Sequence, residues 1–175
     1  MYPEDRDMSV RDALNLIQPN HVAFGSGASS LLSHLAQSLA EEGDAVLIPA
    51  PYYAAFDGDL RMNAGCIAVP VHSKDPTIGP TVDDLEQAAT WAEDKGLKVA
   101  ILLITNPNNP LGTIYPPGEI MKSSIEWARS RHLHTIVDEI YALSTHDGQF
   151  QSILRTLNND LQHDVSEECT SMCFI

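Results

Sequence analysis

The chain has 175 residues, and its 24 acidic side chains outnumber its 10 Lys and Arg residues, so the formal net charge is −14. An acidic chain with scattered cations repels phosphate backbones and anionic lipids, so we expect no nucleic acid and no membrane as partners. An apolar fraction of 43% is typical of a globular domain of this length. The three cysteines form no CxxC pair, which favours a reducing compartment, and we expect a cytoplasmic protein.

The first half of the chain alternates between helical and extended patterns. Apolar side chains share one face of a predicted helix over residues 10–17, and a short strand is predicted at 21–24. A second amphipathic helix is predicted through residues 31–39, where a glycine soon ends it. Apolar runs rich in β-branched residues predict two further strands, at 45–48 and 66–71.

The second half continues the alternation. Thr81 followed by Asp84 is typical of a capping box, and it predicts a helix that ends near Gly96. The remaining predicted elements are a strand at 99–104, a helix from Pro116 or Pro117 to about residue 128, and a strand at 135–137. Strands that alternate with helices in this way predict an α/β fold with a mostly parallel sheet flanked by helices.

Polar or glycine-rich segments follow four of the predicted strands. They are Gly25–Ser29, Pro49–Tyr53, Thr105–Gly112 and Asp138–Tyr141. In open α/β sheets, ligands bind outside the carboxyl ends of the strands, so we expect these segments to converge on one crevice.

Two of these segments favour a phosphate and a flat ring. The glycines and hydroxyls of Gly25–Ser30 precede a helix, whose first amides can bind a phosphate, although an ordinary capped turn is an alternative. A dinucleotide site is disfavoured because Ser30 replaces the third glycine and no acid follows the next strand. Tyr52 and Tyr53 provide rings that either stack on a planar ligand or pack in the core.

The other two segments favour an amide donor and a carboxylate. Two Asn-Pro steps make the loop after residue 105 stiff, so an Asn side chain there can donate to a ligand oxygen. Asp138 ends an apolar strand and needs a cationic partner if it is buried. His132, His134 or a metal could serve, but the strand offers no third metal ligand. A protonated ring nitrogen fits better, and the hydroxyl of Tyr141 could reach the same ligand.

A phosphate, a planar ring, a ring oxygen and a protonated ring nitrogen together describe pyridoxal 5′-phosphate. The ordered motifs GSGAS, PYY, NPNNPLG and DEIYA resemble the large domain of class I/II aminotransferases of fold type I. The stretch LIPAPYYAAFDGDLRMNAG is similar to 1-aminocyclopropane-1-carboxylate synthases and their synthase-like relatives. On this resemblance, residues 20–165 form part of a large domain, residues 1–19 a residual N-terminal helical segment, and residues 166–175 a divergent tail.

The resemblance implies six cofactor-binding residues. They are Ala28 and Ser29 at the phosphate, Tyr53 against the pyridine ring, Asn109 and Tyr141 at the 3′ oxygen, and Asp138 at the pyridinium nitrogen. The resemblance also implies a small-molecule amino acid as substrate and a homodimer as the family's assembly. The peptide between Asn109 and Pro110 is expected to be cis, as it often is in relatives.

The family's catalytic lysine has no counterpart in the sequence. In the enzymes that the chain resembles, this lysine follows the DEIYA region and forms a Schiff base with the cofactor. No lysine follows Lys122 here, so we assign no catalytic residue and expect the chain as printed to be inactive. The alternative is a non-catalytic module that binds phosphate or pyridoxal phosphate, or that pairs with a full-length relative.

Overall fold

The computed structural model describes residues 22–116, 118–146, 150–153 and 172–174. The helix predicted at residues 10–17 lies outside the described residues, as does the boundary expected between residues 165 and 166. No helix in the described part of the chain is long and apolar enough to span a membrane.

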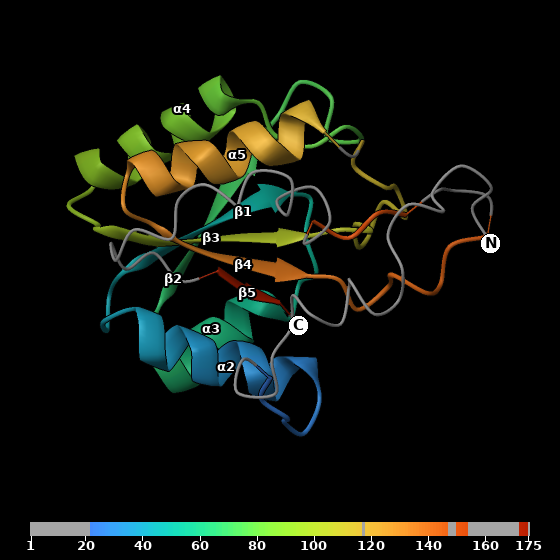
Figure 1. Ribbon diagram of the computed structural model, residues 1–175. Coiled ribbons are helices and arrows are strands. Elements are labelled where there is room, and N and C mark those ends of the chain that lie inside the picture. Colours follow the sequence, from blue (N-terminus) through green and yellow to red (C-terminus); the bar gives the residue numbers. More distant parts are fainter. Residues whose placement is uncertain (1–21, 117, 147–149, 154–171, 175) are drawn as a thin grey trace.

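A five-stranded sheet, in which every pairing is parallel, forms the centre of the molecule (Figure 1). The strands are β1 Ala45–Ala50, β2 Ile67–His72, β3 Val99–Thr105, β4 His134–Asp138 and β5 Met172–Phe174. They are arranged in the order β2-β1-β3-β4-β5. The predicted parallel α/β architecture is therefore confirmed.

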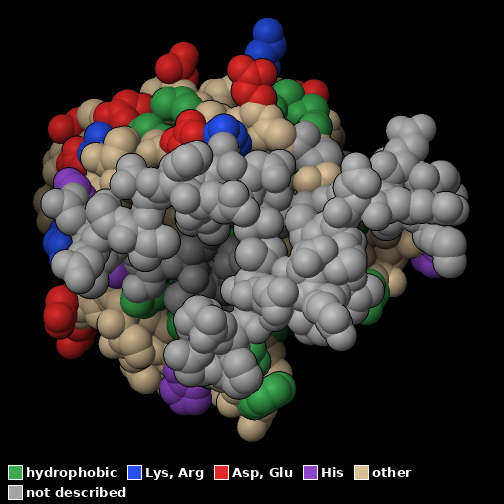
Figure 2. All heavy atoms as spheres, viewed as in Figure 1, with side chains coloured by type: hydrophobic (Ala, Val, Ile, Leu, Met, Phe, Trp, Pro, Cys, Tyr) green, Lys and Arg blue, Asp and Glu red, His purple; other side chains and the backbone are tan. Residues whose placement is uncertain are grey.

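Two layers of helices cover the sheet. They are α2 Ala28–Leu39 and α3 Phe56–Ala64 on one face, and α4 Val82–Asp94 and α5 Glu119–Ser130 on the other (Figure 1). The capping box of α4 is present, because the Thr81 hydroxyl accepts from the Asp84 amide at 3.2 Å while the Asp84 carboxylate accepts from the Thr81 amide at 2.9 Å. The acidic surplus lies partly over α4 and α5, where Figure 2 shows several Asp and Glu side chains.

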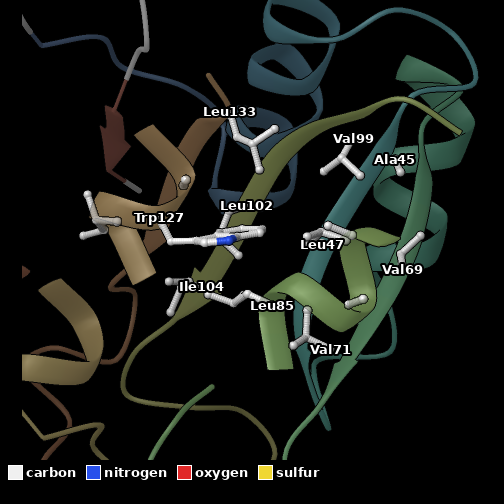
Figure 3. Packing of buried hydrophobic residues seen from close by; sticks show 14 of the residues in the cluster. Ala45, Leu47, Val69, Val71, Leu85, Val99, Leu102, Ile104, Trp127 and Leu133 are labelled. Atoms are coloured by element: carbon white, nitrogen blue, oxygen red, sulfur yellow. The ribbon is translucent and has the colours of Figure 1, made fainter. Parts of the chain in front are cut away.

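The central strand β3 supplies both cores, since all seven of its residues are buried. Leu102 and Ile104 face α4 and α5, whereas Ile101 and Leu103 face α2 and α3, as the alternation of side chains along a strand requires. Figure 3 shows Trp127 of α5 lying against Leu102 and Ile104. Burial on both faces explains why this strand is a continuous apolar run in the sequence.

Strand β1 pairs with its two neighbours over different lengths. Its pairing with β2 continues to Ala50 and His72, but its pairing with β3 ends at Leu47 and Leu102. Pro49, which has no N–H to donate, lies two residues beyond this last pair. The carboxyl ends of β1 and β3 are therefore no longer joined by backbone hydrogen bonds.

The structure corrects the predicted elements in several places. Residues 22–24 form no strand, and Phe24 is 96% exposed, because no described strand lies beside this segment to bond with it. Helix α5 begins at Glu119 rather than at Pro116 or Pro117, because Gly118 has φ +125°, which is incompatible with a helix. Helix α3 and strand β5 were not predicted.

Candidate functional site

The carboxyl ends of β1, β3 and β4 point to the same edge of the sheet, as the arrowheads in Figure 1 show. A cavity of about 250 Å³ lies at this edge, between the strand ends and the layer of α2 and α3. All six predicted site residues line it, namely Ala28, Ser29, Tyr53, Asn109, Asp138 and Tyr141. The remaining lining residues are Leu32, Phe56, Leu103, Thr105 and Ile140. Segments more than 100 residues apart in the sequence therefore meet around one space.

The N-terminus of α2 forms one wall of the cavity. Ala28 and Ser29 are the first two residues of this helix, and no side chain of the described residues caps it. The first hydrogen bond of the helix runs from the Leu31 amide to the carbonyl of the N-cap residue Gly27 at 3.1 Å. The amides of α2 before Leu31 therefore have no acceptor within the helix. Free amides together with the positive end of the helix dipole favour an anion. Gly27 turns the chain into the helix with φ +92°, a conformation that other residues rarely adopt.

The two tyrosines after β1 have different surroundings. Tyr53 lines the cavity, is 44% exposed, and meets the Phe56 ring edge-on with 5.5 Å between ring centroids. The Tyr52 hydroxyl donates to the Asp57 carboxylate at 3.0 Å, and burial together with this carboxylate raises the pKa of Tyr52 to about 12. Tyr53 thus lines the cavity, whereas Tyr52 is bonded to Asp57 of α3, packs against the core on that side and is not a lining residue.

The loop after β3 holds itself in place through its own side chains. Asn106 and Asn108 are both buried, and the sequence did not single them out individually. The Asn106 side-chain oxygen Oδ1 accepts from the Tyr115 amide at 2.8 Å, and the Asn108 side-chain oxygen Oδ1 accepts from the Leu111 amide at 3.1 Å. The peptide between Asn109 and Pro110 is cis, as expected. The density of Asn and Pro in this motif was the sequence signal for a stiff loop, although it did not show which Asn side chains hold the loop in place.

Asn109 and Tyr141 meet at the mouth of the cavity. The Asn109 amide nitrogen lies 3.5 Å from the Tyr141 hydroxyl, at the limit of a hydrogen bond. Both side chains are at least partly exposed, so both have polar atoms available to a ligand. The structure therefore places the amide and the hydroxyl, which the resemblance assigned to one ligand oxygen, side by side.

Asp138 lies deep in the cavity, with only 6% of its surface exposed. One of its carboxylate oxygens, Oδ1, accepts from the Ile140 amide at 3.0 Å. Burial raises the pKa of Asp138, and the Ile140 amide and the Thr105 hydroxyl offset only part of this rise. Within the described part of the chain, Asp138 forms no ion pair. A cationic ligand atom would stabilise the charged form of this carboxyl.

Thr105 is a lining residue that the sequence analysis did not select. Its Cα pairs with that of Asp138 across the sheet, and its side chain is buried. The hydroxyl lies near enough to lower the pKa of Asp138, yet it forms no hydrogen bond of regular geometry. A buried hydroxyl without a partner is costly, so a polar ligand atom in the cavity would improve its environment.

Glu139 faces a different part of the molecule from Asp138. Its Oε1 accepts from the Ile153 amide at 2.9 Å, which ties residues 150–153 to the end of β4. Burial raises the pKa of Glu139 as well, and the neighbouring Asp138 charge adds to the rise. Only the first carboxylate of the DEIYA motif therefore faces the cavity.

None of the chain's lysines lies in the cavity. The four lysines are Lys74, Lys95, Lys98 and Lys122, and all are among the described residues. None of them is a lining residue. The described residues can therefore surround a ligand but offer it no amine for a covalent bond.

The chain matches the model of one protein family, described as aminotransferase class I and II, over residues 9–170. It is 40% identical over 147 residues to the human "Probable inactive 1-aminocyclopropane-1-carboxylate synthase-like protein 2", covering 79% of this chain and 26% of the relative. It is 37% identical over 151 residues to "1-aminocyclopropane-1-carboxylate synthase 2" of Arabidopsis thaliana, covering 85% of this chain and 30% of the relative.

Solved structures of aminotransferases also match the fold of this chain. An aspartate aminotransferase from Thermus thermophilus with maleate matches with a TM-score of 0.60 and 26% identity, over 72% of this chain and 31% of that chain. The chain thus spans between a quarter and a third of the length of these relatives.

Proposed function

Because this chain belongs to the aminotransferase class I and II family, whose cofactor is pyridoxal 5′-phosphate, we propose that its cavity binds this cofactor. One observation carries the proposal: a buried carboxylate without a cationic partner among the described residues lies in the same cavity as a helix N-terminus with free amides. The first favours a protonated ring nitrogen and the second a phosphate. Pyridoxal phosphate has both groups on one ring.

The donor set fits the cofactor group by group. The amides of Ala28 and Ser29 would hold the phosphate, and the Ser29 hydroxyl would add a further donor. Tyr53 would lie against the pyridine ring. The 3′ oxygen would accept from Asn109 and Tyr141. The Thr105 hydroxyl, which lacks a partner at present, lies where it can support the charged form of Asp138.

When bound, the cofactor supplies an electron-poor ring that withdraws electrons from an amino-acid carbanion. The chain's own lining residues would orient the ring. Asp138 holds a proton on the ring nitrogen, because its charge stabilises the pyridinium form. With no lysine in the cavity, binding by residues 1–175 would be reversible.

We extend this proposal to the activity, the ligand class and the assembly of the protein. We propose that residues 1–175 as printed are inactive, because they place no lysine in the cavity. We propose further that the family's ligand class, a small-molecule amino acid, and its homodimeric assembly apply to the protein, and that it functions in the cytoplasm, as its cysteine usage suggests. We likewise propose that residues 20–165 form the large-domain part, between an N-terminal segment at 1–19 and a tail at 166–175.

Thermal unfolding in the presence of pyridoxal phosphate tests the cofactor site. We expect the melting temperature of the 175-residue chain to rise with ligand concentration, because a ligand that binds only the folded state stabilises it. Asp138→Asn should weaken binding about tenfold or more, since a charge-assisted bond becomes a neutral one. Borohydride should fix no cofactor stoichiometrically at a single site of the protein.

Asp94→Asn makes the same chemical change on the exposed surface of α4 and serves as the matched control. It should leave the ligand-dependent shift unchanged. If pyridoxal phosphate at millimolar concentration shifts neither the wild type nor the control, the cofactor proposal is wrong. Covalent capture at one lysine would show that a lysine reaches the ligand after all.

A further inference from the structure

The contact with Tyr141 alone does not fix the direction of the Asn109 side chain. This side chain reaches the Tyr141 hydroxyl only at 3.5 Å, which is too long to fix its direction strongly. The direction of the Asn109 side chain must therefore come from the loop that carries it. The residue before it, Asn108, is the one that organises this loop.

Asn108 forms four hydrogen bonds from a buried position. Its backbone amide donates to the Thr113 carbonyl at 2.8 Å, and its backbone carbonyl accepts from the Gly112 amide at 2.9 Å. Its side-chain oxygen accepts from the Leu111 amide at 3.1 Å. Its side-chain nitrogen donates to the Tyr115 hydroxyl at 2.9 Å. The last bond is the one that joins the loop to a side chain packed in the core.

Tyr115 is anchored in the core that lies beneath α4 and α5. It is 2% exposed, and burial raises the pKa of its hydroxyl. A Cβ added at Gly79 would lie 3.3 Å from two atoms of its ring, so the ring is held closely on that side. Its backbone amide donates to Asn106, which holds the start of the same loop. The core thus holds the Tyr115 hydroxyl in the position where it accepts from the Asn108 side chain.

We propose that Tyr115 is a positioning residue: through its bond to Asn108 it orients the Asn109 side chain toward the ligand oxygen in the cavity. The inference rests on the proposed cofactor function for its role at the ligand. A buried bond of this kind preorganises the neighbouring donor before any ligand arrives, which lowers the ordering cost of binding. Tyr115 itself does not touch the cavity.

Tyr115→Phe tests the proposal, because it removes the hydroxyl and keeps the ring in the core. The ligand pair is pyridoxal phosphate and its 3-deoxy analogue, which lacks the oxygen assigned to Asn109. We expect the wild type to prefer pyridoxal phosphate about tenfold, the contribution of one good hydrogen bond. Asn109→Ala should lose the part of this preference that Asn109 contributes and keep only the part due to Tyr141. Tyr115→Phe should lose most of the Asn109 part, while binding of the analogue stays within about twofold.

Tyr52→Phe is the matched control, since it also removes a bonded tyrosine hydroxyl but one outside the cavity. It should keep the wild-type preference. Should Tyr115→Phe unfold too readily for titration, Asn108→Ala removes the other partner of the same bond, together with the bond from the Leu111 amide, and should lose at least as much of the preference. A full preference in a folded Tyr115→Phe variant would overturn the proposal.

Hydrogen exchange without ligand separates this inference from the cofactor proposal. In Tyr115→Phe we expect the Leu111 and Gly112 amides to exchange at least about tenfold faster, because the loop has lost its fixed point. Amides of α4 should be unaffected. If the wild type does not bind pyridoxal phosphate, the cofactor proposal fails. The positioning role of Tyr115 is tested separately, because an unchanged exchange rate of the Leu111 amide in Tyr115→Phe would overturn it whether or not the cofactor binds.

Discussion

The two faces of the sheet are built differently. On the side of α4 and α5, polar groups are paired with one another: Trp127 donates to Glu86 at 2.7 Å, and Arg131 pairs with Glu86 and with Glu93. On the side of α2 and α3, the cavity contains a carboxylate without an ion pair and a hydroxyl without a bond among the described residues. The difference suggests that one layer holds the fold together, while the other leaves polar groups available to a ligand.

We call the side of α4 and α5, where the polar groups are paired, the closed layer, and the side of α2 and α3, which contains the cavity, the open layer. The largest expected effect lies in the closed layer, at Trp127. Trp127→Ala should lower the free energy of unfolding by about 4 kcal/mol, because it leaves a cavity against β3 and leaves Glu86 without its indole donor. Arg131, which lies over the Trp127 ring, would lose that contact too. Urea unfolding followed by circular dichroism measures the change.

Trp91→Ala is the matched control, because Trp91 lies on α4 and is 53% exposed. Its replacement should cost less than about 1 kcal/mol. If the two tryptophan variants lost equal stability, the distinction between a closed layer and an open one would not hold.

The next effect compares the two helix N-termini. Thr81→Ala removes the capping box of α4 and should cost about 1 kcal/mol. Ser26→Ala, just before the uncapped start of α2, should change stability by only a few tenths of a kcal/mol, because Ser26 is exposed and α2 has no side-chain cap. Equal losses in urea unfolding would indicate that α2 is capped after all.

The smallest effect has the opposite sign and occurs in the cavity. Burial raises the pKa of Asp138 in the folded state, so folding is favoured below the unfolded pKa of about 3.9 and this contribution is lost as pH rises through the folded pKa. Without ligand, Asp138→Asn should therefore be more stable than the wild type at pH 7, by about 0.5 kcal/mol. The gain should disappear near pH 3, and unfolding curves at both pH values test this.

Most of the fold, and the meeting of the six proposed site residues around one cavity, could be predicted from the sequence. β3 was visible because burial on both faces makes it a continuous apolar run, and α4 because its capping box is local. Helix α3 was missed because only Phe56 and Leu60 are buried in a segment interrupted by Gly58, which gives almost no periodic pattern. Strand β5 is only three residues long, and its pairing with β4 is not visible in its own sequence.

The residues that support the cavity from behind were harder to predict than the residues that line it. Asn109 and Asp138 belong to a recognisable motif, but Tyr115 acts through a bond to Asn108 that depends on where the core holds its ring. In the sequence, Thr105 is simply the last residue of a mostly apolar strand. Its importance comes from its neighbour across the sheet, which no pattern along the chain reveals.

The pairing between β1 and β3 ends early, at Leu47 and Leu102. Pro49, two residues later, has no N–H with which to extend this pairing. The segment that leads to Tyr53 is therefore not bonded to β3 by the sheet, although Ala50 still pairs with His72 of β2. An adjustment of the Tyr53 ring against a ligand would break no backbone hydrogen bond between β1 and β3.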